Sequence, residues 1–209
     1  MKQLFMIEDT KSPIRTISYS PNGVSLAVGA EPNTLEVYST PDYKRKANLK
    51  KHSGPVNHID WSTDSHYLQT NSESQELLYF NAQDKDYNHI IELKQNIRNE
   101  PWATHNCIYT WSTQGIWKDT MKKGTEINGA DRSNTKWYKE YQILATGDDN
   151  SNISLYKLPC VQPHAEGVVA RGHSSFISDI KWSQDDSYLV SIGGEDQTII
   201  VWKVIKSSN

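Results

Sequence analysis

The stretch that decides the fold runs from Gly172 to Trp202 and reads GHSSFISDIKWSQDDSYLVSIGGEDQTIIVW. It contains an apolar–polar–aromatic–serine segment that ends at Ser183, then a polar turn, then a second apolar segment that begins at Leu189. The same order recurs at Ile17–Gly29 and at Ile59–Asn71. Because internal repetition constrains the whole architecture, it outweighs any local assignment of helix or strand.

A fourth copy keeps only the second half of the pattern, from Leu144 to Tyr156, and aligns without a gap on Leu26–Tyr38. The aromatic residues that close the four units are Tyr38, Phe80, Tyr156 and Trp202. The first two are 42 positions apart and the last two 46, close to the period of a four-stranded propeller blade. The middle interval is 76 positions, which predicts one blade with an insertion at 118–140.

The repeat predicts an all-β fold, a β-propeller of WD-repeat type with about four four-stranded blades. The approximate blades are 1–42, 43–85, 86–160 with the insertion, and 161–209. If each unit begins with its outer strand, we expect outer strands at Gln3–Ile7 and Tyr87–Leu93. We also expect an inner strand at Thr198–Trp202 that neighbouring blades cover on both faces. Four blades are the low end for propellers, so a four-blade ring and part of a larger propeller both remain open.

The last unit opens with Gly172-His173 and ends at Trp202, which is the WD-repeat signature. In that family a His, a Ser or Thr, a turn Asp and the Trp form a hydrogen-bonded set. The matching positions are His173, Ser191, Asp196 and Trp202. The second unit keeps His52 and Thr70, but it has Phe80 for the Trp and no matching Asp. We therefore expect one complete network, with the other units held by packing.

The middle of the chain resembles a specific family. The segments that carry the resemblance are Trp102–Thr104, Cys107, Gly115–Trp117, Ile127–Ala130, Arg132-Ser133, Leu144–Asp149 and Leu158–Cys160. They resemble the C-terminal propeller of the echinoderm microtubule-associated protein-like (EMAP) family, and His52–Tyr79 and Gly172–Ile205 resemble its flanking blades. The resemblance covers roughly residues 14–205. It implies a cytoskeletal binding protein with tubulin as partner class and without catalysis.

Composition excludes several classes of protein. Lys and Arg total 22 against 25 Asp and Glu, a net charge of −3 that argues against nonspecific nucleic-acid binding. The sequence shows no signal peptide and no apolar run of membrane-spanning length, so we expect a soluble cytoplasmic protein without a membrane partner. Two cysteines, Cys107 and Cys160, suit buried thiols in a reducing compartment.

Enzyme, metal and cofactor motifs are absent from the sequence. The seven histidines form no HExxH pattern or paired Cys/His spacing, and no phosphate-binding loop or nucleophile elbow occurs. Asp148-Asp149 could suggest a metal-binding pair, but a turn between two strands explains it better. We expect no enzyme activity, no metal and no cofactor.

Candidate partner-binding residues fall into three groups. The clearest is the basic cluster Lys44, Arg45, Lys46, Lys50 and Lys51, because no acid occurs between Tyr43 and Ile59 and tubulin exposes acidic tails. Lysines on a solvated edge strand that prevent aggregation are the competing explanation. The expected insertion adds Lys118, Lys122 and Lys123, and also Trp137, which either anchors a partner or packs over the blade edge.

Two functions remain in competition. The first is a non-catalytic, microtubule-associated scaffold, and the second is a general WD-type adaptor that docks peptides or proteins without binding tubulin. Salt sensitivity separates them, since binding through lysines weakens with ionic strength. If the chain is a fragment of a larger ring, its open blade edges allow self-association with a second copy.

Overall fold

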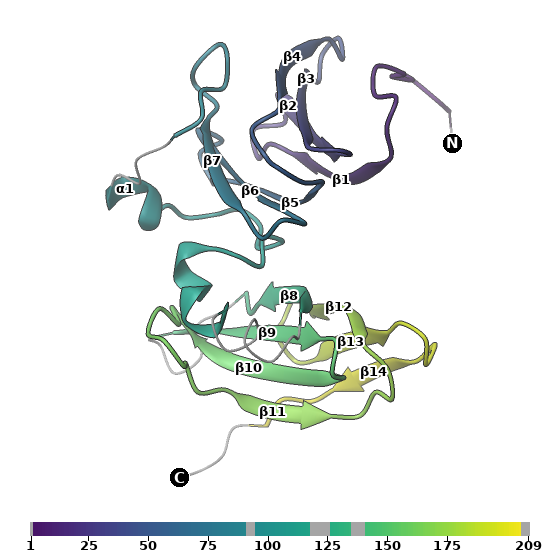
Figure 1. The fold of residues 1–209 in the computed structure, drawn as a ribbon, viewed down its shortest axis with the longest axis vertical. Coiled ribbons are helices and arrows are strands. Elements are labelled where there is room, and N and C mark those ends of the chain that lie inside the picture. Colours follow the sequence, from purple (N-terminus) through teal and green to yellow (C-terminus); the bar gives the residue numbers. More distant parts are fainter. Residues whose placement is uncertain (1, 91–94, 118–125, 135–140, 206–209) are drawn as a thin grey trace. The chain divides into compact units, whose positions relative to one another are not determined.

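The computed structural model describes residues 2–90, 95–117, 126–134 and 141–205 (Figure 1). Four antiparallel sheets make up nearly all of the regular structure, which confirms the expected all-β class. The chain divides into two compact units, residues 1–109 and 110–209. Each unit contains two of the sheets.

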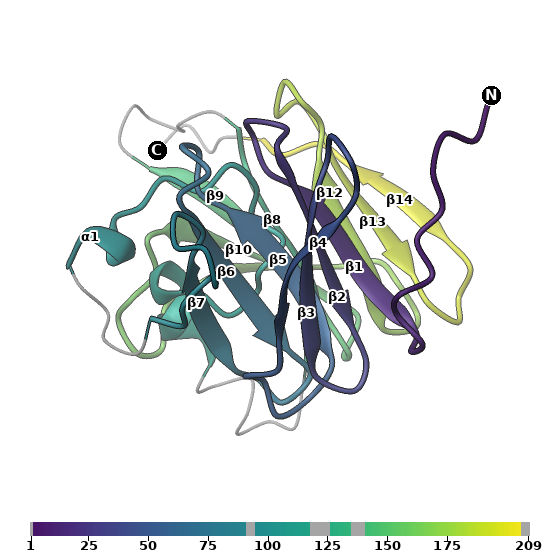
Figure 2. The ribbon, with the colours of Figure 1, turned by 90° about the horizontal axis from the view of Figure 1, so that it is seen from above.

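Unit 1 contains a four-stranded first sheet and a three-stranded second sheet, each a simple meander (Figures 1 and 2). The strands of the first sheet are β1 (Ile14–Tyr19), β2 (Ser25–Ala30), β3 (Thr34–Ser39) and β4 (Arg45–Leu49). Those of the second are β5 (Val56–Trp61), β6 (Tyr67–Ser72) and β7 (Leu77–Asn81). A single helical turn, α1 (Gln95–Arg98), follows.

Unit 2 repeats this plan with a four-stranded third sheet and a three-stranded fourth sheet. It begins with a short 3₁₀ helix, η1 (Trp111–Thr113). The third sheet contains β8 (Ile127–Arg132), β9 (Gln142–Asp148), β10 (Asn152–Leu158) and β11 (Val168–Arg171). The fourth contains β12 (Ile177–Trp182), β13 (Leu189–Gly193) and β14 (Ile199–Trp202). None of the described helices is long and apolar enough to cross a membrane.

The serine that follows the first strand of a sheet stabilises the turn to the second strand. Ser62 Oγ accepts a hydrogen bond from the backbone N–H of Tyr67 at 2.9 Å and donates to Asp64 at 2.6 Å, which closes the turn between β5 and β6. Ser183 does the same with Tyr188 and Asp185. A side chain that bonds its own turn fixes the hairpin register, so the aromatic–serine pattern marks the strand end.

The third sheet also has its first strand, contrary to our expectation that this repeat lacked its first half. Strand β8 pairs with β9, and Ser133 Oγ accepts from the N–H of Ile143 at 2.9 Å, the contact made by the other turn serines. Strand β8 lies inside the segment 118–140, which we predicted to be an insertion. That prediction was wrong for residues 127–132. The longer connection between β8 and β9 hid the strand from a gapless comparison.

Within each unit the two sheets stack through the first strand of the later sheet. In unit 1 β5 packs on β1 and β2, and in unit 2 β12 packs on β8 and β9. The larger buried apolar cluster of unit 1 contains Ala27, Leu35, Val37, Val56, Ile59, Trp61, Leu68, Phe80 and Tyr87, and a smaller one contains Leu26, Val28 and Tyr38. The core of unit 2 consists of Ala145, Ile153, Ile177, Ile180, Trp182 and Leu189. Burying each large side chain contributes roughly 1.5–3 kcal/mol, so these contacts dominate the stability of each unit.

An aspartate at the same register position, buried in unit 1 and half-buried in unit 2, extends the packing of both units. Asp60 is fully buried in β5 and accepts hydrogen bonds from Thr104 Oγ1 at 2.6 Å and from the N–H groups of Asn106 and Cys107 at 2.8 and 2.9 Å. Asp131 in β8 accepts from the N–H of Trp182 at 2.7 Å. Burial raises the pKa of Asp131, and the bond from Trp182 opposes that effect. Asp60 thus joins the segment 104–107 to the second sheet, and Asp131 joins β12 to the third sheet.

The strand expected near the N-terminus is absent, and the strand predicted at Thr198–Trp202 is present but not buried as expected. Residues Gln3–Ile7 form no strand; they lie beside the first sheet, with the Phe5 ring 5.0 Å from that of Tyr43. Strand β14 is not covered on both faces by described residues, because Ile199 and Val201 are 71% and 61% exposed. The expected outer strand at Tyr87–Leu93 is reduced to one bridge between Phe80 and His89, and 91–94 lie outside the described residues.

Sheets and sequence units are offset by one strand. Strand β4 pairs with β3, so Arg45–Leu49 completes the first sheet although it falls in the expected unit 43–85. In the same way β11 pairs with β10, although it falls in the expected unit 161–209. The basic residues 44–46 therefore belong to the outer edge of the first sheet.

The closest sheet contact in unit 2 gives a stability prediction. A Cβ added at Gly147 would lie 2.4 Å from Ile177 Cγ2, so Gly147→Ala forces β12 away from β9. We expect a loss of about 1–3 kcal/mol in the free energy of unfolding, measured by urea denaturation.

The double variant Gly147→Ala/Ile177→Ala is the control. Because Ile177→Ala removes Cγ2, the nearer of the two clashing atoms, the two changes should cost less together than the sum of the single variants. Additive losses would contradict the assigned contact.

Candidate functional site

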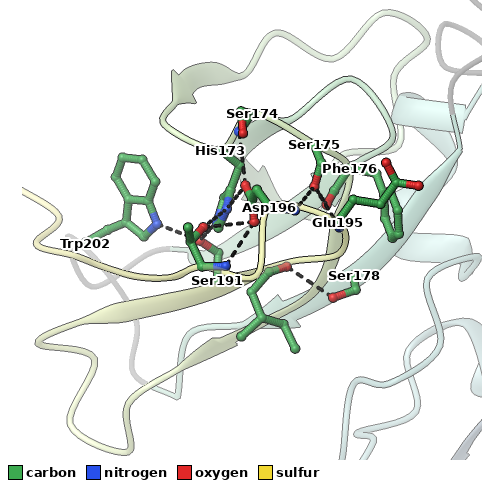
Figure 3. Close-up of polar contacts among 11 residues, drawn as sticks. His173, Ser174, Ser175, Phe176, Ser178, Ser191, Glu195, Asp196 and Trp202 are labelled. Atoms are coloured by element: carbon green, nitrogen blue, oxygen red, sulfur yellow. Dashed lines mark hydrogen bonds and ion pairs between the residues drawn. The ribbon is translucent and has the colours of Figure 1, made fainter.

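The hydrogen-bond network predicted for the last repeat is present in the fourth sheet (Figure 3). His173 Nδ1–H donates to the Asp196 carboxylate at 3.0 Å, and His173 Nε2 accepts from the Ser191 hydroxyl at 2.7 Å. The indole N–H of Trp202 donates to the same hydroxyl at 2.8 Å. The side chain of His173 is fully buried. The network therefore joins the loop before β12 to β13 and β14.

Asp196 is held as a carboxylate by its neighbours. Partial burial alone would raise its pKa, but hydrogen bonds from the N–H and hydroxyl of Thr198, the N–H of Ser174 and the imidazole of His173 outweigh it. Together they lower the pKa of Asp196 to about 2. The carboxylate fixes which nitrogen of His173 carries the proton, because a carboxylate can only accept.

The second sheet has a corresponding network that the sequence comparison missed. His52 Nδ1–H donates to Glu76 at 3.0 Å, and His52 Nε2 accepts from Thr70 at 2.7 Å. Glu76 takes the place of the aspartate, so our expectation that this unit relies on packing was wrong. Phe80 occupies the position of the Trp, so the indole donor is missing. Glutamate has a longer side chain than aspartate, and Glu76 stands at a different distance along the chain from its histidine. A search for an aspartate at fixed spacing therefore does not find it.

Burial and hydrogen bonding set the protonation of this second network. Burial lowers the pKa of His52, although Glu76 opposes that effect, so the imidazole is neutral at pH 7. Burial would raise the pKa of Glu76, but hydrogen bonds from the N–H and hydroxyl of Ser53, from His52 and from Ser72 lower it to about 2. The pair is thus a neutral imidazole donating to a carboxylate.

The first sheet contains a different buried carboxylate. Glu36 is 3% exposed and accepts from Tyr38 Oη at 2.6 Å and from Asn48 Nδ2 at 3.3 Å, as well as from Thr10. Burial, reinforced by the bond to Glu36, raises the pKa of Tyr38 to about 12. This group also binds Arg45, whose guanidinium lies 3.2 Å from Glu36.

The structure divides the basic cluster into side chains that are bonded within the first sheet and side chains that are not. Arg45 pairs with Glu36 and approaches Asp9 at 3.9 Å, and Lys46 Nζ donates to Ser25 Oγ at 3.0 Å. These two residues therefore support the first sheet. The sequence search for acids within 43–59 could not find Glu36 or Asp9, because both are brought to the cluster by folding.

Lys44, Lys50 and Lys51 remain exposed. The Lys44 side chain is 84% exposed and lies 3.4 Å from Asp42, an ion pair that is worth little in water. Lys50 and Lys51 are exposed and make no ion pair with a described residue. These three lysines, which we call the lysine surface, are the part of the cluster open to a partner.

The other predicted partner-binding residues belong to the segment 118–140. Lys118, Lys122, Lys123 and Trp137 lie outside the described residues.

Among the described residues no group of three or more His, Cys, Asp or Glu side chains could hold a metal ion. Asp148 accepts from the N–H groups of Asn150 and Asn152 at 2.9 Å, which is a strand-connecting turn. Cys107 and Cys160 are buried free thiols.

An apolar groove in unit 2 was not predicted. It has a volume of about 860 Å³ and lies beside β10 and the loop that follows it. Its apolar lining residues include Ile143, Leu155, Tyr156, Pro159, Val161 and Val168. Grooves of this size with aromatic and aliphatic walls suit a peptide side chain or chain segment. Residues far apart in sequence form it, so no local pattern announces it.

The Glu76 network generates a pH prediction. Because the folded-state pKa of Glu76 is about 2 and its ordinary value 4.5, its stabilisation is complete above about pH 4.5 and is lost as the pH falls toward 2. Glu76→Gln should cost roughly 1–2 kcal/mol at pH 7, after allowance for solvent screening, and the difference from the wild type should shrink below pH 4.5. Urea unfolding at pH 7, 5, 4 and 3 measures this.

The exposed neighbour Glu73 supplies the control, since Glu73→Gln removes the same charge outside the network. It should leave the stability nearly unchanged at each pH. A difference between Glu76→Gln and the wild type that stays constant with pH would contradict the assigned network.

Comparison with known proteins gives the family. Residues 1–204 match the model of the echinoderm microtubule-associated protein second β-propeller. The chain is 30% identical over 203 residues to Echinoderm microtubule-associated protein-like 3 of Mus musculus, which covers 95% of this chain and 22% of that protein. It is 36% identical over 201 residues to the 77 kDa echinoderm microtubule-associated protein of Lytechinus variegatus, covering 94% of this chain and 29% of that protein.

Solved structures support the fold. The β-propeller domain of Cps50 (Swd1) from Myceliophteria thermophila aligns with a TM-score of 0.53 at 17% identity, covering 95% of this chain and 56% of that one. The propeller architecture expected from the repeat is thereby confirmed. The chain spans less than a third of the length of the two curated relatives above. By its family match, the chain belongs to the echinoderm microtubule-associated protein family, within whose second β-propeller its residues fall.

Proposed function

We propose that this chain is a non-catalytic protein-binding part of a microtubule-associated propeller, with tubulin as its partner and the cytoplasmic cytoskeleton as its location. The names of its relatives, which are microtubule-associated proteins, support the partner class. The observation that carries the proposal for this chain is the lysine surface of Lys44, Lys50 and Lys51. These side chains are exposed and basic on a chain whose net charge is −3.

The lysine surface suits an acidic protein partner for electrostatic reasons. Lys44 directly precedes β4, and Lys50 and Lys51 directly follow it, at the edge of a four-stranded sheet whose strands β2 and β3 are buried. A rigid sheet holds the charges in place, so binding costs little backbone entropy. Attraction between opposite charges at an exposed surface accelerates the association of two proteins, and added salt weakens that attraction. Neither nucleic acid nor a membrane is needed as a partner in this proposal.

The apolar groove of unit 2 favours a second candidate, an adaptor that docks a peptide without binding tubulin. Its walls combine Tyr156 with aliphatic residues such as Leu155 and Val161, and Lys157 lies over the Tyr141 ring at 4.9 Å from its centroid. Burial of apolar side chains would dominate such binding. Because apolar burial is little affected by ionic screening, added salt distinguishes the two candidates.

Co-sedimentation of the full chain with polymerised tubulin over a series of salt concentrations tests the proposal. We expect pelleting at low salt that declines as salt is added. The variant Lys44→Glu/Lys50→Glu/Lys51→Glu should weaken binding roughly tenfold or more, because attraction at three points becomes repulsion. Arg45 and Lys46 are left unchanged, since they bind within the first sheet.

A variant with the same change in net charge serves as the matched control. Lys85, Lys181 and Lys203 are exposed and lie outside β4 and its flanking segments in the sequence, so their replacement by Glu should leave most of the binding intact. Thermal melts establish that each variant is folded. Equal losses in the two triple variants, or pelleting that does not depend on salt, would reject the lysine surface. Absence of pelleting by the folded wild type would reject tubulin binding by this chain.

A further inference from the structure

Strand β4 forms an open edge of the first sheet. It is the last strand in the order β1-β2-β3-β4, and among the described strands it pairs with β3 alone. Its side chains are exposed or half-buried from Arg45 to Leu49. A strand at the edge of a sheet presents backbone N–H and C=O groups without a partner strand, and an extended peptide can pair with them. An edge is not a face, so its accessibility does not depend on which sheets stack on either side.

The pairing of β3 with β4 shows which backbone groups of β4 point outward. The N–H of Ser39 donates to the carbonyl of Lys44 at 2.8 Å, so the odd-numbered residues of β3 direct their backbone groups toward β4. These odd-numbered residues lie opposite Ala47 and Leu49, whose backbone groups therefore bond to β3. Asn48 stands between the two. Because backbone groups alternate in direction along a strand, its N–H and C=O point away from the sheet.

The charges around this edge favour an acidic strand. Lys44 directly precedes β4, and Lys50 and Lys51 directly follow it, so the lysine surface lies at both ends of the edge. Within β4, Lys46 donates to the neutral hydroxyl of Ser25, a contact that leaves its positive charge unbalanced. A second β4 strand would bring like charges opposite one another, which disfavours pairing. An acidic strand would bring opposite charges together at the same positions.

The outer strand of the third sheet has the same topology but different charges. Strand β11 is also the last of four strands, and among the described strands it pairs with β10 alone. Val168 and Val169 are 72% and 55% exposed, and Glu166 lies two residues before the strand. The one basic side chain of β11 is that of Arg171, which donates to Asn152 at 2.8 Å. An acidic peptide is therefore expected to prefer the β4 edge to the β11 edge.

We propose that β4 binds an extended acidic peptide as a fifth strand of the first sheet. Main-chain hydrogen bonds with Asn48 hold the peptide in register, and the lysine surface attracts its carboxylates. This inference rests on the proposed function, because it uses the same lysine surface, and it adds the conformation in which the acidic partner binds. The lysines then have two effects: they oppose pairing with a like-charged edge, and they attract an acidic strand.

Amide hydrogen exchange measured by NMR tests the backbone pairing. The probe is a capped ten-residue peptide that alternates Glu and Thr, added to the full chain at low salt. Concentrations up to about 1 mM are needed, because an extended peptide loses conformational entropy when it binds. Near saturation the Asn48 amide should exchange about tenfold more slowly, whereas the Ala47 amide, already bonded to β3, should change little. Unchanged exchange at Asn48 while the peptide is bound overturns the proposal.

A pair of variants at Asn48 tests the same hydrogen bond by affinity. Asn48→Pro removes the outward N–H, and proline is tolerated on an edge strand where that N–H faces solvent. Asn48→Ala is the matched control, since both variants lose the side-chain bond to Glu36. In fluorescence anisotropy with the labelled peptide, Asn48→Pro should bind about fivefold more weakly than Asn48→Ala. Equal affinities of the two folded variants overturn the proposal, and if Asn48→Pro does not fold, hydrogen exchange of the wild type decides.

The outcomes separate this inference from the proposed function. Lys44→Glu/Lys50→Glu/Lys51→Glu should weaken peptide binding about tenfold or more, and a peptide with Lys in place of each Glu should not bind. Salt-dependent pelleting with tubulin, together with peptide binding that leaves Asn48 exchange unchanged, keeps the proposed function and rejects the added strand. Peptide binding that protects Asn48, without pelleting, supports the added strand and rejects tubulin. Absence of peptide binding by the folded wild type rejects the added strand, whatever the pelleting result.

Discussion

The structure depends on one packing contact, in which the first strand of a sheet buries three apolar side chains against the sheet before it. Val56, Ile59 and Trp61 make this contact in unit 1, and all are at most 1% exposed. A sheet of three or four strands has two faces and cannot cover both by itself. Stacking is therefore what makes nearly continuous apolar strands such as β2 and β3 stable.

Stacking also removes polar side chains from water, and four of them are hydrogen-bonded within their own unit. Asp60 and Asp131 accept backbone N–H groups from the next segment, while His52 and His173 each donate to a carboxylate. A buried polar group without such a partner would cost several kcal/mol. The networks accordingly hold the loops that connect the sheets, and the side chains left for a partner are those on outer strands and edges.

The repeat pattern predicted the sheets well where strand, turn and strand are close in sequence. The turn serines explain why, because the hydroxyl bonds a residue only five positions later and leaves little room for variation. Prediction failed where a connection changed length: β8 was missed before a longer loop, and Glu76 was missed because a longer side chain reaches His52 from a shifted position. The expected strand at Gln3–Ile7 failed because a strand needs a partner edge, which local sequence does not report.

The sequence by itself determined the all-β class, the repeated strand–turn–strand units, the WD-type set around His173, and the resemblance to the EMAP family, because these depend on residue types at short and regular spacing. The tertiary structure decided which charges are free. Glu36, from the neighbouring strand, takes Arg45 out of the basic cluster and leaves Lys44 exposed. It also decided which apolar faces are covered, since β1 and β12 carry the same pattern but differ in burial. Burial depends on what lies opposite in space, and spacing along one chain does not contain that information.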